Sequence, residues 1–224
     1  MSVLPSRVTS ALLGAAVMLA SATAGQAADL DFMPPPELRP SLPWEGFYAG
    51  GLLTGGFLDA TYTPSANPDP ELAGDGIMGG FVAGHNWQFG NVVVGVEADA
   101  SYGKIEADNT VDEVEYNIPW LLTARARLGY AFDNTLIYGT AGVGVFEGEM
   151  ILPAFGESDK KTHVGLVIGG GMEHAFNDQL RGRLEYIHGN FENQVYDFTP
   201  GTVDLEIDDL HLMRAALVWN FSAH

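Results

Sequence analysis

Apolar and polar residues alternate along most of the chain after residue 44, and this period of two is typical of strands whose two faces meet different surroundings. In the segment 92–102, for example, the even positions are apolar while Glu97 and Asp99 stand at odd positions. Clusters of turn residues separate the segments that alternate in this way. We therefore predict eight strands, at 46–58, 76–89, 92–105, 116–132, 135–148, 162–176, 179–191 and 208–221.

The connections between these strands alternate strictly between short and long. Three are tight turns at 89–91, 132–135 and 176–179, each a phenylalanine followed by polar or glycine turn residues. The other four are longer and polar, and they are centred near residues 67, 110, 155 and 200. Short turns at one end and long loops at the other are the construction of an outer-membrane barrel, because in lipid every backbone donor must find a partner. We predict an all-β fold, an eight-stranded antiparallel up-and-down transmembrane β-barrel whose short turns face the periplasm.

Charged residues within the strands indicate which face meets lipid. In the strands analysed for alternation, they fall on the less apolar face, as Arg125 and Arg127 do in WLLTARARLGYAF at 120–132. An arginine facing lipid would cost ~2–4 kcal/mol near the bilayer midplane, so the charged face is expected to line the lumen. Eight strands enclose a lumen that side chains fill, and arginine pairs well with carboxylates in such a place. We predict an ion-pair network in the lumen, structural or pore-lining, made of Glu97, Asp99, Arg125, Arg127, Glu173, Arg181, Arg183, Glu185 and Arg214.

Aromatic residues gather near the ends of the predicted strands, as expected of girdles at the two membrane interfaces. The belt predicted at the periplasmic end consists of Phe47, Trp87, Phe89, Tyr130, Phe132, Phe176, Trp219 and Phe221. The belt predicted at the other rim consists of Tyr102, Tyr116, Trp120, Phe146, Tyr186 and Phe191.

The first 43 residues differ from the rest in composition. Residues 1–27 combine a basic Arg7, an apolar stretch and small residues before the expected cleavage point, which is typical of a secretory signal peptide. Residues 28–43 contain many prolines, which disfavour helix and sheet, and predict an extended periplasmic spacer. The barrel is then expected at 44–221, followed by a C-terminal overhang at 222–224.

Charge and composition exclude some partners. The formal net charge is −19, and an acidic surface repels phosphate backbones, so we expect no nucleic-acid partner. Cysteine is absent, which excludes disulfides and thiolate metal sites. The segments DNTVDEVE at 108–115 and VDLEIDDLH at 203–211 predict acidic outer loops, where divalent cations shared with lipid phosphates would bind weakly.

No pattern in the chain indicates catalysis. Ser101 is the single serine within a predicted strand, and although Glu97 and Asp99 are near it, no strand histidine stands clearly on the same rim and face. The histidines form no H-E-x-x-H pair, and the glycine-rich segments lack the residues of a phosphate-binding loop. We expect no catalytic residues, no cofactor and no metal site.

Two segments carry a resemblance to a known family. WEGFYAGGLLTGG at 44–56 and the closing LVWNF at 217–221, with glycine-spaced strands between them, resemble the small outer-membrane surface proteins of alphaproteobacteria. These are porin-like or opacity-type eight-stranded barrels, similar to the transmembrane domain of OmpA. The resemblance spans 44–221 and implies an abundant structural protein and surface antigen without catalytic residues. It also implies that Trp219 and Phe221 form the signal read by the outer-membrane assembly machinery, although three residues follow Phe221 here.

Three functions remain open from the sequence. The first, which we favour, is a structural barrel of the bacterial outer membrane that stabilises the envelope, contacts lipid and lipopolysaccharide, and displays acidic loops. The second is a narrow porin-like diffusion channel, which requires a continuous water path through the lumen. The third is a soluble lipocalin-like carrier, which requires an apolar interior and a polar exterior, the reverse of the polarity inferred here.

Overall fold

The computed structural model describes residues 44–64, 71–109, 114–152, 156–197 and 202–221. The predicted signal peptide at 1–27, the spacer at 28–43 and the overhang at 222–224 lie outside these residues. Within the part described, no helix has the length and apolarity that crossing a membrane requires.

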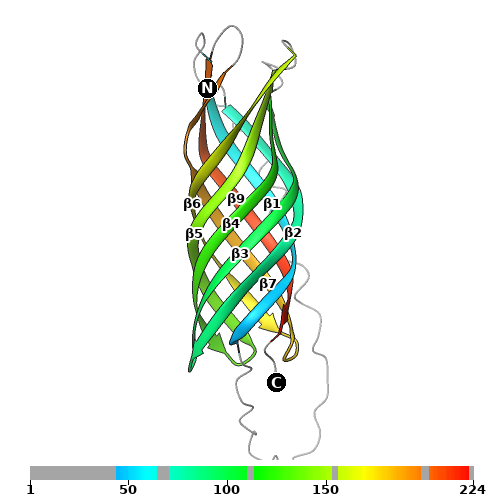
Figure 1. Cartoon of the computed structure of the whole chain (residues 1–224), viewed down its shortest axis with the longest axis vertical. Coiled ribbons are helices and arrows are strands. Elements are labelled where there is room, and N and C mark those ends of the chain that lie inside the picture. The colour runs from blue at the N-terminus through cyan, green and yellow to red at the C-terminus, as the bar shows by residue number, and fades with distance from the viewer. Residues whose placement is uncertain (1–43, 65–70, 110–113, 153–155, 198–201, 222–224) are drawn as a thin grey trace, which may run out of the picture. The chain divides into compact units, whose positions relative to one another are not determined.

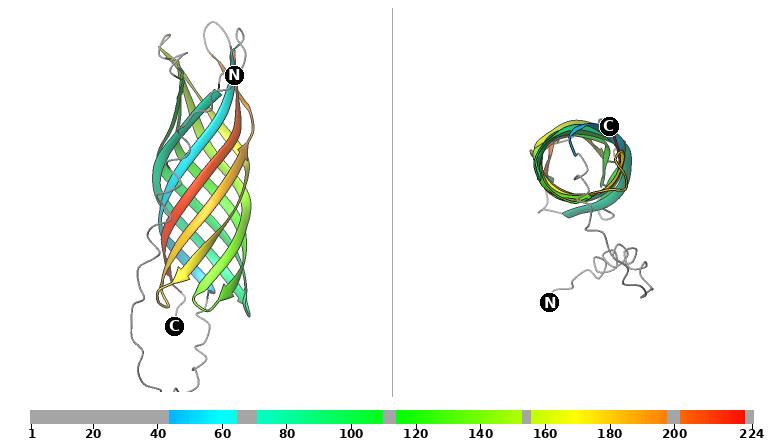
Figure 2. Two further views of the ribbon diagram at one scale, coloured as in Figure 1. Left: turned by 180° about the vertical axis from the view of Figure 1, so that it is seen from behind. Right: turned by 90° about the horizontal axis from the view of Figure 1, so that it is seen from below.

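Eight long antiparallel strands and one short strand form a single closed sheet (Figure 1). Each long strand pairs with its neighbours in sequence, and the first pairs with the last, so the sheet closes into the ring seen along the barrel axis in Figure 2. Closure leaves no unpaired edge, which a barrel wall in lipid requires. The strands are β1 (Gly46–Pro64), β2 (Glu71–Phe89), β3 (Val92–Asn109), β4 (Val114–Phe132), β5 (Thr135–Leu152), β6 (Glu157–Ala175), β7 (Leu180–Phe191), β8 (Gln194–Asp197) and β9 (Thr202–Asn220).

The predicted eight-stranded barrel is confirmed, and the observed strands are longer at the loop end. Seven of the eight long strands are 18 residues or more, because pairing continues past the apolar part of the wall. The long connection predicted near residue 200 is shorter than expected. It contains β8, which pairs with the first part of β9, from Gln194↔Leu205 to Asp197↔Thr202. The segment 203–211 is therefore strand rather than loop.

The two faces of the wall differ as the alternation predicts. Because one sheet forms the whole barrel, a buried side chain lies in the lumen and an exposed one lies on the outer wall. Leu166, Ile168 and Leu217 are 72%, 62% and 61% exposed, whereas Glu173 is completely buried. The outer wall is thus an apolar belt, and it becomes polar toward the loop end, where Asp59, Asp75, Lys104, Glu147 and Lys160 point outward.

The aromatic belts are only partly as predicted. All eight aromatics expected at the periplasmic end are exposed on the outer wall, and so are Tyr102 and Tyr186 at the other rim. Tyr116, Phe146 and Phe191, however, are buried in the lumen. The pairing of β4 with β5 shifts register between Asn117 and Leu121, which reverses the inward and outward positions, so Tyr116 turns inside. Phe146 and Phe191 simply occupy inward positions of β5 and β7.

Candidate functional site

The nine charged residues predicted to share the lumen are all buried there. They come from five strands: β3 supplies two carboxylates, β4 two arginines, β6 and β9 one residue each, and β7 three residues. Their exposures range from 0% to 5%. The residues are Glu97, Asp99, Arg125, Arg127, Glu173, Arg181, Arg183, Glu185 and Arg214. No single strand holds a balanced set. Neighbouring strands already place Glu97 beside Arg125 and Glu173 beside Arg183. The contacts that join β4 to β6 and β3 to β7 need the closed barrel.

Two glutamates link most of the arginines. Glu97 lies 2.6 Å from Arg125 and 3.4 Å from Arg127, and it also contacts Arg183. Glu173 lies 3.2 Å from Arg127 and 2.8 Å from Arg183, and its other carboxylate oxygen lies 3.4 Å from Arg181. Arg127 and Arg183 thus bridge the same two carboxylates although their strands, β4 and β7, are not neighbours.

The remaining two carboxylates extend the network toward β9. Asp99 lies 3.0 Å from both Arg125 and Arg214. Glu185 lies 2.9 Å from Arg125 and 3.8 Å from Arg214. Arg125 therefore contacts three carboxylates, and all nine residues belong to one connected network.

Tyrosines that the alternation alone did not single out complete the network. The network has five arginines against four carboxylates, a difference of 5 − 4 = +1. Tyr48 donates a hydrogen bond to Glu97 at 2.7 Å and accepts one from Arg127 at 3.0 Å. Tyr138 donates to Glu185 at 2.9 Å, and the Arg127 guanidinium lies 4.0 Å from the centre of its ring. The aromatic rings thus give the excess cation a favourable surface.

Apolar layers lie on both sides of the charged network. At the periplasmic end, Trp44 is 1% exposed and packs with residues next to the short turns. Its backbone is held by Gln88 at 2.7 Å and Asn86 at 3.2 Å, and Arg181 lies 4.6 Å from the centre of its ring. Toward the loop end, a larger buried cluster fills the lumen. Its members include Leu58, Met78, Ile105, Ile118, Leu121, Phe146, Met150, Ile187, Phe191, Leu210 and Leu212.

A small cluster of buried polar side chains lies next to this apolar layer, on the side of the long loops. His163 Nε2 lies at hydrogen-bond distance from the hydroxyls of Tyr196, at 2.8 Å, and Tyr116, at 3.1 Å. The other ring nitrogen, Nδ1, lies 3.1 Å from the Glu192 carbonyl oxygen. Its ring stacks on Phe146, with ring centres 4.8 Å apart. Burial raises the pKa of the Tyr196 hydroxyl, which belongs to β8 beyond the apolar belt, so this hydroxyl stays protonated. These contacts join β8, which pairs with β9 in the wall, to the side chains that fill the loop end of the lumen.

The other residues singled out in the sequence lie apart from the lumen network or at its margin. Trp219 and Phe221 point outward at the periplasmic rim, and the Phe221 amide donates to the Phe47 carbonyl at 2.9 Å. Ser101 is buried above the network, with its hydroxyl 3.5 Å from that of Thr54. The acidic segment 108–115 lies partly outside the described residues.

A closed barrel with an apolar outer belt, aromatic residues at its rim and paired charges inside is a transmembrane β-barrel of the bacterial outer membrane. The chain belongs to the outer membrane protein beta-barrel domain family, whose model matches residues 12–221. The protein is accordingly a protein of the outer membrane.

Relatives in alphaproteobacteria support the same assignment. The chain is 31% identical over 172 residues to a 22 kDa outer membrane protein of Rhizobium leguminosarum bv. viciae, covering 77% of this chain and 76% of the relative. It is 32% identical over 201 residues to a 25 kDa outer-membrane immunogenic protein of Brucella canis, covering 88% of this chain and 91% of the relative. The predicted resemblance to small alphaproteobacterial outer-membrane proteins is therefore confirmed.

Solved structures show the same fold at low sequence identity. The outer membrane protein OprG of Pseudomonas aeruginosa matches with a TM-score of 0.58 and 12% identity, covering 78% of this chain and 95% of that protein. Neisserial surface protein A matches with a TM-score of 0.51 and 13% identity, covering 78% and 97%.

Proposed function

We propose that this protein is a structural barrel that stabilises the outer membrane and does not conduct. The observation that carries the proposal is the layering of the lumen, in which the charged network lies between Trp44 at the periplasmic end and an apolar cluster at the loop end. A continuous water path needs polar lining along its whole length, and these apolar layers interrupt it. The network, by contrast, links five strands through buried ion pairs and so favours a rigid wall.

A narrow diffusion channel is the second candidate, and the charged lumen is the observation in its favour. Rings of charged side chains line the selective part of many pores. The two proposals differ in a measurable way, because a filled lumen passes no ions.

Planar-bilayer recordings distinguish the two. We expect no stable stepwise conductance from the refolded barrel or from Glu97→Gln, which changes the lumen charge without touching the outer wall. A porin reconstituted in the same way shows that the bilayers report channels. Stable steps from the unmodified protein, with an ion preference that Glu97→Gln alters, would establish the channel instead.

The structural role has its own test in cells. A strain lacking the protein is expected to admit more of a hydrophobic dye and to become more sensitive to detergent. Restoring the protein should reverse both effects. If the deletion leaves dye entry and detergent sensitivity unchanged, the envelope does not depend on this barrel.

Surface display and assembly are further parts of the proposal. The Brucella relative is named an immunogenic protein, and we infer by similarity that the loop end of this barrel is exposed as a surface antigen. The outer wall contacts lipid, with lipopolysaccharide as the expected neighbour in the outer leaflet. Trp219 and Phe221 are proposed as the signal for the assembly machinery, residues 1–27 as the export signal and 28–43 as the periplasmic spacer.

Weak binding of divalent cations by the acidic segments at the loop end remains a proposal as well. Carboxylate oxygens suit calcium, but these segments lack the glycine and spacing of a tight loop site. Titrating calcium into the refolded barrel is expected to raise its unfolding midpoint and to protect the loops from protease. If neither the midpoint nor protease sensitivity changes, the loops do not bind calcium.

A further inference from the structure

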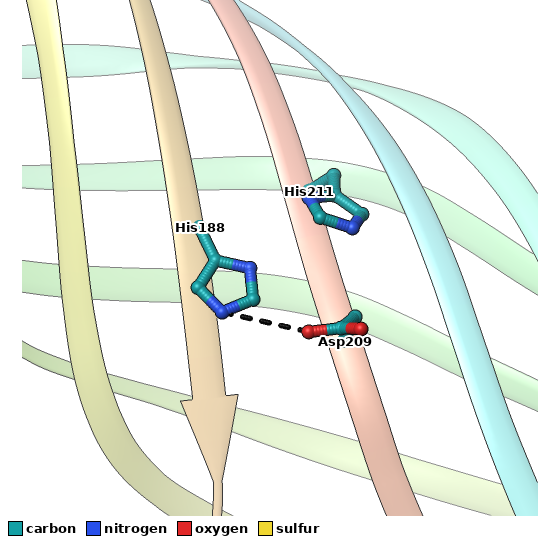
Figure 3. A group of neighbouring side chains, drawn as sticks. All are labelled: His188, Asp209 and His211. Atoms are coloured by element: carbon teal, nitrogen blue, oxygen red, sulfur yellow. Dashed lines mark ion pairs between the residues drawn. The ribbon is translucent and has the colours of Figure 1, made fainter.

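Two histidines and an aspartate lie together on the outer wall near its loop end (Figure 3). His188 comes from β7, and Asp209 and His211 come from β9. One ligand atom from each residue lies within 4.8 Å of the others, and all three residues are half-buried. Among the described residues, this is the one group of histidine and carboxylate side chains arranged in this way.

The strand pairing brings these side chains together. His188 and His211 are direct partners across β7 and β9, and Asp209 lies two positions before His211 on the same face of β9. His188 Nε2 lies 3.4 Å from Asp209 Oδ1. Ligand atoms around a tetrahedral Zn²⁺ are roughly 3.4 Å apart, given metal–nitrogen bonds of about 2.0–2.1 Å. The pair of His188 and Asp209 already has this spacing, and a rotation of the His211 side chain would bring in the third ligand.

A hydrogen bond orients the second histidine. Tyr186 OH lies 2.7 Å from His211 Nδ1. A metal bound through Nε2 of His211 would keep this contact. Histidine ligands in metal sites usually have such a partner on their other ring nitrogen.

The charges around the group favour a cation. Asp209 is the direct partner of Asp59 in the pairing of β1 with β9, and both point outward. Like charges directly opposite each other across two strands are destabilising. A divalent cation next to Asp209 would offset this repulsion. Imidazole nitrogen suits zinc, copper or nickel, whereas calcium and magnesium prefer oxygen ligands alone.

We propose that His188, Asp209 and His211 form a binding site for a divalent transition metal of the zinc class. Three protein ligands leave one position for water or for an anionic group at the membrane surface. The site lies just beyond the apolar belt, next to the outward side chains of Tyr186 and Met213. The metal would join the closing strand β9 to β7 from outside the barrel. This site differs from weak calcium binding by the loops in its histidine ligands and its place on the wall.

The test uses the full barrel, refolded in detergent and treated with chelator, titrated with Zn²⁺ by calorimetry and with Co²⁺ by visible absorbance. We expect a single equivalent to bind, with the absorbance of nitrogen-ligated Co²⁺ and a higher unfolding midpoint. His188→Ala, Asp209→Asn and His211→Ala should each weaken binding by at least about tenfold, a loss typical of disturbing a metal site. Tyr186→Phe should weaken it less.

His174→Ala is the matched control, because His174 also lies on the outer wall but at the periplasmic end, 3.0 Å from Thr135. It should leave binding unchanged. The proposal is overturned if Zn²⁺ fails to bind at stoichiometric concentration, if the three substitutions leave affinity unchanged, or if Ca²⁺ at the same concentration competes. Each variant's heat-dependent gel mobility shows whether it has folded, so a folding failure is distinguished from a lost ligand.

Discussion

Single buried charges are expected to contribute strongly to the stability of this barrel. Glu173 is completely buried and contacts Arg127, Arg181 and Arg183. Removing one member of a buried ion pair leaves its partner charged and without compensation, which costs far more than losing a pair on the surface. The cost of removing a carboxylate is higher still in this network, since arginines already outnumber carboxylates.

Glu173→Gln is therefore expected to destabilise the barrel by about 3–5 kcal/mol, because three buried arginines lose a countercharge. Unfolding by denaturant in lipid vesicles measures the change. Glu106→Gln is the control, since Glu106 is 57% exposed on the outer wall and pairs with Lys104 there. Its loss should be within about 1 kcal/mol. Equal stability of the two variants would mean that the buried network adds little.

At the scale of the strand, positions that face the lumen and positions that face lipid differ in the side chains they can accommodate. On the lumen side of β5, a Cβ added at Gly142 would lie 2.1 Å from the Ala124 carbonyl oxygen of β4. On the lipid side of the same strand, a Cβ at Gly139 would have its nearest contact at 3.9 Å. Glycine is thus required at the first position by close approach of the neighbouring backbone and not at the second.

Gly142→Ala should destabilise the barrel by about 1–3 kcal/mol, the usual cost of overpacking a well-packed site. Gly139→Ala should change stability by less than about 0.5 kcal/mol, as outward substitutions usually do. Both are measured by the same unfolding titration. A larger effect at Gly139 than at Gly142 would contradict the close approach of β4 and β5.

Depth in the membrane also determines which side chains a strand position can accommodate, and two residues on the outward face of β6 allow a comparison. Ile168 lies within the apolar belt and is 62% exposed, whereas Thr162 lies on the same face toward the loop end. Ile168→Arg should cost about 2–4 kcal/mol in vesicles and Thr162→Arg about 0–1, because the cost of arginine falls from the midplane to the interface. Equal costs at both positions would place the membrane elsewhere on the wall.

For the whole molecule, closure of the sheet is the event that creates the buried network. The first and last strands pair over most of their length, and Phe221 extends this pairing to Phe47. The charged residues of β3 and β4 meet those of β6, β7 and β9 only in the closed ring. Insertion and closure of the C-terminal strand are therefore expected to control how much folded barrel reaches the membrane.

Phe221→Ala tests this at the level of assembly. It should reduce the amount of folded, heat-modifiable protein in outer-membrane fractions, because the proposed recognition residue is lost. Phe132→Ala is the control, since Phe132 is also exposed at the periplasmic rim, at 54% against 63%. Refolding of both variants into vesicles should be similar. If both accumulate equally in cells, Phe221 is not the assembly signal.

The amino-acid sequence by itself determined the strands, their alternating faces and the closed barrel. These features are local: a period of two assigns each side chain to a face, and the cost of arginine in lipid decides which face is inside. The short turns follow from composition in the same way, whereas β8 within the connection near residue 200 was not predicted. This is why Arg125 and Arg127 could be placed in the lumen from one segment of the chain.

Only the tertiary structure decided which residues meet. Pairing across strands depends on register, and a shift such as the one after Asn117 reverses the faces, so Tyr116 lies inside rather than on the rim. The partners of Glu173, the apolar layers of the lumen and the meeting of His188 with His211 all depend on register between strands. Alternation within a strand does not fix its neighbour's register, because register depends on the geometry of the turn and on the packing between the two strands.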